Sequence, residues 1–194
     1  MNIFLKEEKM NKEIIVEKDL DVFLIGTSGG ELDLKINLVN PGVQANIYGI
    51  LIGCKHQSYK VNTLSHHKKQ ETKSRVHIKG VFMDDSSLEY EGMIKIDYGA
   101  QLSDAYLKND NLVIGDNAVI NTSPQLEIEA DDVSASHGVT ISTIDELQEY
   151  YLQSRGLDKV LSTDLLVKGF VQDILAKSGD NIEVKVPAIL KNEK

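Results

Sequence analysis

Short apolar runs that alternate with polar residues recur along the chain from Glu13 to Ile141, and no helical period interrupts them. In residues 31–38, leucine or isoleucine occupies every second position, a period typical of a strand with one buried face. Similar runs follow at residues 48–52, 75–81, 93–98, 111–114, 118–120 and 125–129. Many strands without intervening helices indicate a mainly β fold, either a sandwich, a barrel or a β-solenoid. Periodicity alone does not choose among these, and no repeat of fixed length is present.

The pattern becomes helical after Ser142. Thr143 is the expected N-cap, with Glu146 three residues later, and Gly156 is the expected stop. The residues expected on one face of this helix are Leu147, Tyr150, Tyr151 and Ser154. The sequence thus predicts a short amphipathic helix directly after the β region.

A second helix is predicted over residues 158–177, where Leu166, Phe170 and Ile174 repeat every four residues. Residues 180–194 are expected to add a short strand before a Lys-rich tail. The expected order is therefore many strands followed by two helices.

Three regions follow from these patterns. Residues 1–19 are charged and weakly patterned, and we expect a loosely docked N-terminal arm, with Met1 or Met10 as the true start. Residues 20–141 form the expected β core. Residues 142–194 form the expected C-terminal helical segment and tail.

The balance of charge narrows the choice of partners. The chain has 30 acidic and 21 basic residues, for a formal charge of −9 at pH 7. Such a charge disfavours non-specific binding to nucleic acid or to an anionic membrane. No apolar run is long enough to span a membrane, and Met1 to Met10 lacks the apolar core of a signal peptide. We therefore expect a cytoplasmic protein that binds neither nucleic acid nor a membrane.

Cys54 is the only cysteine, so no disulfide forms within the chain. Cys54 and His56 have Cys-x-His spacing, and His66 and His67 follow, so Cys54 is one candidate metal or cluster ligand. The spacing matches no standard zinc motif, and a cysteine that closes an apolar strand is more often a small core residue. Any bound metal or cluster would need histidine, carboxylate or a second subunit.

No catalytic motif stands out in the sequence. A P-loop, a GxSxG elbow and an HExxH motif are all absent. We therefore expect no enzymatic activity. The runner-up interpretation is a β-helix enzyme, either carbohydrate-active or an acyltransferase, although such enzymes are usually longer or built on recognisable repeats.

A family resemblance enters at residues 123–140. They read SPQLEIEADDVSASHGVT and closely resemble the SPxLEIxADDVxxSHGxT signature of the SufB/SufD family. Downstream, residues 151–157 (YLQSRGL) are similar to its FYLxSRGL, and residues 165–170 (LLVKGF) to its LLxRGF. The signature residues of interest here are Asp131, Asp132, Ser136 and Gly138. Full-size members carry a long N-terminal helical region, so the chain resembles a short, SufD-like core version of the family.

The resemblance implies a right-handed parallel β-helix followed by a small helical segment. It also implies a scaffold for iron–sulfur cluster assembly, paired with a second SufB/SufD-type subunit and docked through its helices on an ABC-type ATPase, SufC in that family. The residues expected to bind this ATPase are Tyr150, Tyr151, Arg155, Leu166 and Phe170. Whether the pair is a homodimer or a heterodimer stays open, as does cluster building versus repair.

His137 is the leading candidate for chemistry, because it occupies the place of a functional histidine in SufD-type members. Small neighbours leave its imidazole accessible to iron or to a transient iron–sulfur cluster, and nearby carboxylates would raise its basicity. SufB-type members carry a cysteine where this chain has Asn109 and a glutamate where it has Gly138. The chain therefore departs from the cluster-building pattern, which keeps open a purely structural role beside a SufB-like subunit.

Overall fold

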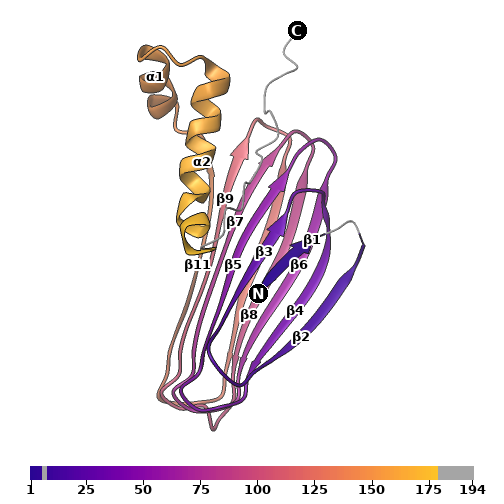
Figure 1. The fold of residues 1–194 in the computed structure, drawn as a ribbon, viewed down its shortest axis with the longest axis vertical. Coiled ribbons are helices and arrows are strands. Elements are labelled where there is room, and N and C mark those ends of the chain that lie inside the picture. Colours follow the sequence, from indigo (N-terminus) through magenta and orange to yellow (C-terminus); the bar gives the residue numbers. More distant parts are fainter. Residues whose placement is uncertain (6–7, 179–194) are drawn as a thin grey trace.

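Two parallel sheets form the body of the protein in a computed structural model that describes residues 1–5 and 8–178 (Figure 1). The described strands are β1 (Asn2–Leu5), β2 (Met10–Val16), β3 (Leu20–Gly26), β4 (Gly30–Leu38), β5 (Gln44–Gly53), β6 (Ser58–His67), β7 (Lys73–Met83), β8 (Ser87–Ile96), β9 (Asp104–Ile114), β10 (Val119–Ile128) and β11 (Ser134–Thr143). Two helices follow, α1 (Glu146–Ser154) and α2 (Lys159–Ser178). The expected order of strands and then two helices is confirmed.

The chain alternates between the two sheets at every strand. The odd-numbered strands form the first sheet in the order β1-β3-β5-β7-β9-β11, and the even-numbered strands form the second in the order β10-β8-β6-β4-β2. Every neighbouring pair is parallel. This topology is a β-solenoid, which confirms the expected fold class and decides among the three architectures that the pattern allowed.

The turns of the solenoid differ in length. Stacked residues lie 25 positions apart at Asp19 and Gln44, 29 apart at Ser58 and Ser87, and 32 apart at Lys95 and Glu127. A repeat of fixed length is therefore absent from the sequence, although the architecture repeats.

The core lies between the sheets and is built from alternate residues of each strand. The alternating apolar residues within 31–38 are all buried, as the sequence predicts. Gly92 belongs to the inward-facing set, and a Cβ there would lie 2.5 Å from Cδ1 of Leu107 in the opposite sheet. The two sheets approach closely at this position because β8 has no side chain there.

Helix α2 covers the outer face of the first sheet. Its buried residues Val167, Val171 and Ile174 pack with Ile50, Ile52, Val81, Met83 and Leu112 of β5, β7 and β9. The expected stripe of Leu166, Phe170 and Ile174 is partly wrong, because Leu166 and Phe170 are only half-buried at the flank of this contact. Contact with the sheet decides which face of α2 packs, and the sequence pattern of the helix alone does not contain this information.

The start of α1 differs from the expectation. Asp145 caps the helix, and its side chain accepts hydrogen bonds from the backbone N–H groups of Leu147 and Gln148. Thr143 is instead the last residue of β11, since its backbone pairs with Val113. The expected stop at Gly156 is confirmed by its φ of 96°, a conformation that glycine adopts without strain.

The N-terminus also differs from the expected loose arm. Within residues 1–19, β1 pairs with β3 and β2 pairs with β4, and Ile3 and Leu5 are buried in the core. Of the charged residues described in this region, only Lys12 and Glu13 lie within a strand. The high content of charged residues therefore hid two short strands that stack on the rest of the solenoid.

No helix in the described part of the chain is long and apolar enough to cross a membrane. The short strand and tail expected within residues 180–194 lie outside the described residues.

Candidate functional site: the open last turn and the helical pair

The last turn of the solenoid, β10 and β11, lacks the neighbour that every earlier turn has. Each strand is the outermost of its sheet in the described part of the chain. In each sheet, the side chains that point toward the core form rows of stacked residues, which we call the inward-facing rows. The residues of β10 and β11 that continue these rows are therefore left at the surface. Those with large exposed side chains are Leu126, Ile128 and Ile141. We call this surface the open end.

His137 lies in the middle of the open end. It pairs with Leu107, a core residue of β9, and partners in parallel strands present their side chains on the same face. Ala135, two residues earlier, packs against the core. The imidazole therefore belongs to the inward-facing row and is exposed only because no further turn covers it. No hydrogen bond or ion pair joins it to residues 1–5 or 8–178, so both ring nitrogens are available.

The rows beneath the open end are unusually polar. Asn109, fully buried, donates to the carbonyl of Ile78 at 3.2 Å and accepts from Asn111 at 2.7 Å. Among the described residues, Oδ1 of Asn111 and Oγ1 of Thr122 are buried without a hydrogen-bond partner. Such groups cost free energy unless something satisfies them.

The structure brings the positions of His137 and Asn109 onto one inward face of adjacent strands, since Asn109 pairs with Val139, two residues beyond His137. Gly138 pairs with Lys108 on the opposite, outward face, where a Cβ would lie 3.5 Å from the Tyr106 hydroxyl. The two departures from the SufB pattern therefore lie on different faces of the sheet.

The other signature residues lie around the turn before β11. Asp131 and Asp132 are exposed, and the backbone N–H of Asp132 donates to Oε1 of Gln101 at 2.9 Å. Ser136 is also exposed. Neither carboxylate pairs with His137 among the described interactions, so the expected support of the imidazole by these carboxylates is not present.

A charged network on the outer face fastens β11 to the preceding turns. Asp110, buried on β9, accepts from Thr140 of β11 at 2.7 Å and contacts Lys108 at 2.7 Å and His77 at 2.8 Å. Burial by itself raises the pKa of Asp110, but the hydrogen bonds from Lys108, Thr140 and His77 outweigh it and lower the pKa below its usual value. The ionised carboxylate therefore ties three strands together.

The helical pair offers a second uncovered surface. An apolar groove between α1 and α2 is lined by Leu147, Gln148, Tyr151, Leu152, Leu165 and Leu166. Phe170 lines an adjoining groove with Leu166. Tyr150 is 72% exposed, and the guanidinium of Arg155 lies 5.1 Å from the centre of the Tyr151 ring. The five residues expected to bind an ATPase thus lie on or beside this surface.

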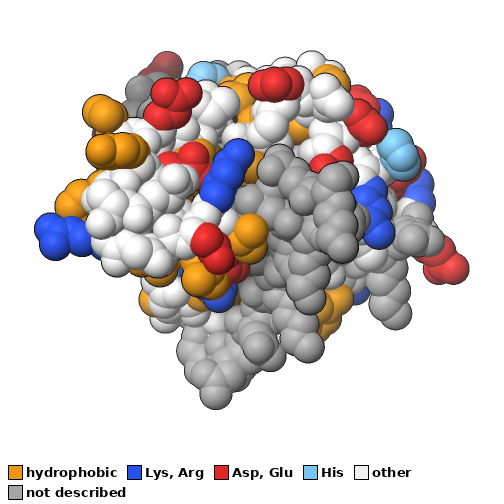
Figure 2. Space-filling view, turned by 90° about the horizontal axis from the view of Figure 1, so that it is seen from above, with side chains coloured by type: hydrophobic (Ala, Val, Ile, Leu, Met, Phe, Trp, Pro, Cys, Tyr) orange, Lys and Arg blue, Asp and Glu red, His pale blue; other side chains and the backbone are white. Residues whose placement is uncertain are grey.

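Figure 2 looks onto the end of the molecule where α1 lies and shows hydrophobic side chains at the surface there, beside acidic and basic ones. None of the residues of α1 is buried. The apolar side chains of α1 that do not contact α2 therefore lie at the surface of the described part of the chain.

The second metal candidate is not assembled. Cys54 begins the loop between β5 and β6, whereas His66 and His67 lie at the far end of β6, about 30 Å away along the strand. Cys54 is half-buried, and burial raises the pKa of its thiol. His56 contacts Asp85 at 3.5 Å instead. Within the described residues, no group of three histidine, cysteine or carboxylate side chains is placed to hold a metal ion.

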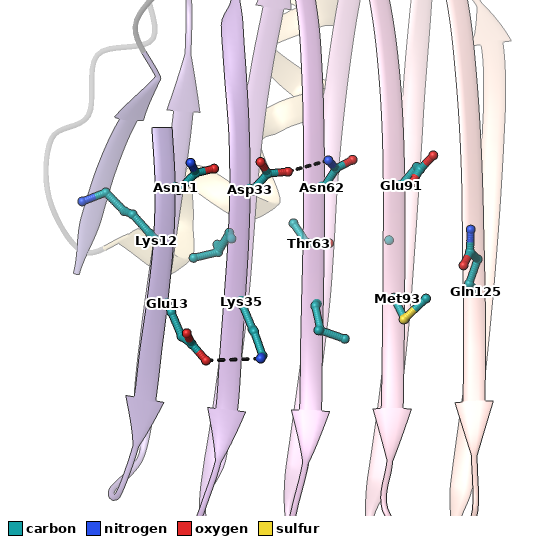
Figure 3. A pocket seen from close by; sticks show the side chains of 13 residues that line it. Asn11, Lys12, Glu13, Asp33, Lys35, Asn62, Thr63, Glu91, Met93 and Gln125 are labelled. Carbon is teal, nitrogen blue, oxygen red and sulfur yellow. Dashed lines mark hydrogen bonds and ion pairs between the residues drawn. The ribbon is translucent and has the colours of Figure 1, made fainter. Parts of the chain in front are cut away.

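A trough of about 540 Å³ crosses the outer face of the second sheet (Figure 3). Asn11, Asp33, Asn62 and Glu91 line one side in a row across four strands. The hydrogen bond from Asn62 lowers the pKa of Asp33, and those from Asn37 and Lys35 lower the pKa of Glu13. A general acid for glycoside cleavage needs a raised pKa, so these two carboxylates do not suit that role.

The fold, the open end and the helical pair define a β-solenoid protein with apolar side chains exposed at its last turn and between its two helices. A family model described as "SUF system FeS cluster assembly, SufBD core domain" matches residues 20–170. The chain therefore belongs to the SufBD core family.

Relatives occur in several bacteria. The chain is 30% identical over 152 residues to the iron-sulfur cluster assembly protein SufD of Escherichia coli, a match that covers 78% of this chain and 36% of that protein. It is 28% identical over 139 residues to SufD of Bacillus subtilis, covering 72% and 32%. A SufBD family protein of Synechocystis, slr0076, is 42% identical over 86 residues, covering 44% and 19%. The chain thus spans about a third of the length of the two SufD relatives.

Proposed function

We propose that the chain is a non-catalytic scaffold subunit of iron–sulfur cluster assembly in the cytoplasm. In this proposal the open end pairs with a second SufB/SufD-type subunit, and the helical pair binds an ABC-type ATPase of the SufC kind. The observation that carries the proposal is the uncovered inward row of the last turn, which leaves His137 with free ring nitrogens inside a surface that another chain would bury.

The cargo in this proposal is iron or a transient iron–sulfur cluster. His137 fits it as a single neutral nitrogen ligand. The described part of the chain offers no group of three metal-binding side chains, so the remaining ligands would come from the partner subunit. A homodimer would then supply two copies of His137, whereas a SufB-like partner would add its own cysteine and carboxylate ligands.

A purely structural role is the second candidate, and one observation favours it. Asn109 is fully buried and hydrogen-bonded where SufB-type members have a cysteine, so it offers no thiolate to a cluster. In this structural role the open end and the helical pair would still bind partners, but His137 would bind no iron or cluster. A carbohydrate-active enzyme would need a carboxyl group with a raised pKa, whereas the pKa values of Asp33 and Glu13 in the trough are lowered, and we do not propose that function.

Removing residues 144–194 tests the docking surface. The shortened chain keeps all strands through Thr143 but lacks α1 and α2, so it should lose co-purification with the ATPase. Because α2 covers an apolar face of the first sheet, folding must be checked by circular dichroism.

A matched pair of point variants avoids the risk that the shortened chain does not fold. Tyr151→Asp places a charge in the apolar groove and should weaken ATPase binding at least tenfold, whereas Gln153→Asp on the exposed part of α1 should not. Full-strength binding by the folded Tyr151→Asp variant would refute the docking assignment.

A further inference from the structure

A chain of polar contacts joins α2 to β11 across the outer face of the first sheet. It begins at Asp173 of α2, which accepts a hydrogen bond from Nζ of Lys79 at 2.7 Å and lies 3.9 Å from Nδ1 of His77. Nε2 of His77 lies 2.8 Å from the carboxylate of Asp110 on β9. That carboxylate in turn accepts a hydrogen bond from the hydroxyl of Thr140 on β11 at 2.7 Å. The helical pair and the last strand of the open end are therefore connected through β7 and β9.

The contact between Asp110 and Thr140 is the shortest side-chain hydrogen bond of β11 in the described part of the chain. Ser142 of β11 also donates to β9, but its hydroxyl lies 3.4 Å from the carbonyl oxygen of Asn111. A hydrogen bond to a carboxylate is stronger than one between neutral groups. β11 is the outermost described strand of its sheet and pairs with β9. The direction in which the Asp110 carboxylate points therefore affects how firmly β11 is held.

Lys79 can reach two carboxylates. In the structure its ammonium bonds to Asp173 and to the carbonyl oxygen of Phe170, both on α2. Its register partner on β9 is Asp110, and partners in parallel strands present their side chains on the same face of the sheet. Neighbouring strands lie about 5 Å apart, which is within the length of a lysine side chain. The ammonium of Lys79 can therefore turn to Asp110 when Asp173 is withdrawn.

A lysine bonded to Asp110 would compete with Thr140. Oδ2 of Asp110 is already in contact with Lys108 at 2.7 Å and with His77 at 2.8 Å. Oδ1 accepts only from Thr140 among the described residues, so Oδ1 is the oxygen left for a further donor. An ammonium group is a stronger donor to a carboxylate than a neutral hydroxyl. Because this ammonium would lie on the β7 side of Asp110, it would draw Oδ1 away from β11.

We propose that Lys79 is a two-position switch that couples α2 to β11. With α2 on the sheet, Lys79 bonds to Asp173, and the carboxylate of Asp110 holds Thr140. When α2 moves away, Lys79 bonds to Asp110 and releases Thr140, which loosens the strand that carries His137. Only the functional consequence rests on the proposed function: binding of an ATPase to the helical pair would change the geometry of the open end.

Hydrogen exchange of the isolated chain in dilute solution tests this coupling. Asp173→Ala removes the carboxylate from α2 and should raise the exchange rates of the β11 amides, residues 138–142, by at least about threefold. Asp164→Ala is the matched control on the same helix, because Asp164 pairs with Lys168 of α2 and should leave those rates unchanged. Both aspartates are partly exposed, so neither variant opens the core, and circular dichroism checks the fold of each.

A second background separates the switch from a general loosening of the helix. Lys79→Met removes the ammonium that would move to Asp110. Asp173→Ala combined with Lys79→Met should therefore leave the β11 exchange rates near those of the wild type. Weaker packing of α2 alone would instead raise the rates whether or not the lysine is present.

Three results would overturn the coupling. They are unchanged β11 rates in Asp173→Ala, an equal increase in Asp164→Ala, and an increase that persists in the combined variant with Lys79→Met. Neither the ATPase nor a partner subunit takes part in this experiment. Its failure therefore leaves the docking and pairing assignments to their own tests, and failure of those tests leaves the coupling in place.

Discussion

At the scale of single residues, His67 shows how the solenoid accommodates a titratable group in its interior. It is fully buried, and its two ring nitrogens bond to the hydroxyls of Thr72 and Ser74, each at 2.8 Å. Burial, reinforced by the neighbouring His66, lowers the pKa of His67 from 6.5 to about 4. The hydroxyls can donate or accept, so they satisfy a neutral imidazole and the folded protein keeps it uncharged at neutral pH.

This burial predicts acid sensitivity of known sign. Between pH 6.5 and 4 the unfolded chain binds a proton at His67 that the folded protein does not, so stability falls as the pH falls through this window. The free energy of unfolding should drop by about 3 kcal/mol more in the wild type than in His67→Gln. Urea unfolding at pH 7, 5 and 4 measures the difference. Parallel pH profiles for the two proteins would contradict the prediction.

His137 differs from His67 because it is exposed and has no hydrogen-bond partner among residues 1–5 and 8–178. His137→Ala should therefore change stability by only about 1 kcal/mol or less, since little packing is lost. If the proposed role is right, the variant should still bind the ATPase but should reduce the activity of a reporter iron–sulfur enzyme in cells that depend on this protein.

Two other substitutions serve as controls for His137. Cys54→Ser and Asn109→Ala should affect the reporter less, although Asn109→Ala should lower stability because Asn111 loses its partner. Normal reporter activity in His137→Ala would leave the histidine with a structural role and would favour the purely structural partner.

At the scale of elements, one lysine fixes α2 on the sheet. Lys79 of β7 donates to the carbonyl of Phe170 at 2.6 Å and to Asp173 at 2.7 Å, and it lies 4.7 Å from the Phe170 ring centre. Burial raises the pKa of Asp173, but the hydrogen bond and charge of Lys79 together with His77 lower it overall. The sequence did not reveal this contact, because its partners lie more than 90 positions apart.

Lys79→Met should remove the hydrogen bonds to Phe170 and Asp173 while keeping most of the aliphatic packing. We expect a loss of about 1–2 kcal/mol in the free energy of unfolding, together with weaker ATPase binding if α2 shifts. Lys168→Met is the matched control on α2, since it breaks an exposed ion pair with Asp164 and should cost less than about 0.5 kcal/mol. Equal thermal and urea stabilities for the two variants would show that Lys79 does not anchor the helix.

At the scale of the whole molecule, the two ends of the solenoid are not equivalent. Lys12 of β2 pairs with the core residue Leu34, so a charge occupies the inward row at the N-terminal end. Figure 3 shows its side chain extending away from the neighbouring strands. A charge in this position opposes stacking of another sheet. The inward rows of β10 and β11 carry no lysine, arginine or carboxylate, which favours pairing at the open end.

This asymmetry predicts where a dimer forms. Ile141→Asp at the open end should convert a dimer to a monomer, because it places a charge among side chains that a partner would bury. Ile15→Asp at the N-terminal end should leave the dimer intact, and the two isoleucines are similarly exposed, at 52% and 55%. Light scattering at several concentrations measures both. A strictly monomeric wild type would indicate that a different chain is the required partner. Dissociation by Ile15→Asp would contradict the prediction, because it would place the dimer contact at the N-terminal end.

The sequence by itself determined the class of elements and the family. Strand alternation such as that of residues 31–38 and the helical spacing after Ser142 are local patterns, because each depends on the side-chain period of a single element. The signature at residues 123–140 is likewise contiguous. These features could be predicted without coordinates.

Only the tertiary structure decided which residues meet. In the structure, β1 and β2 pair with strands of the solenoid, and Cys54 lies far from His66. Asp110 contacts both His77 and Thr140. The structure also places His137 on the inward face at an uncovered end. The reason is register: stacked residues lie 21 to 32 positions apart in turns of unequal length, and a slip of one residue reverses every side chain in a strand. That register is set by packing between turns, which no single strand encodes.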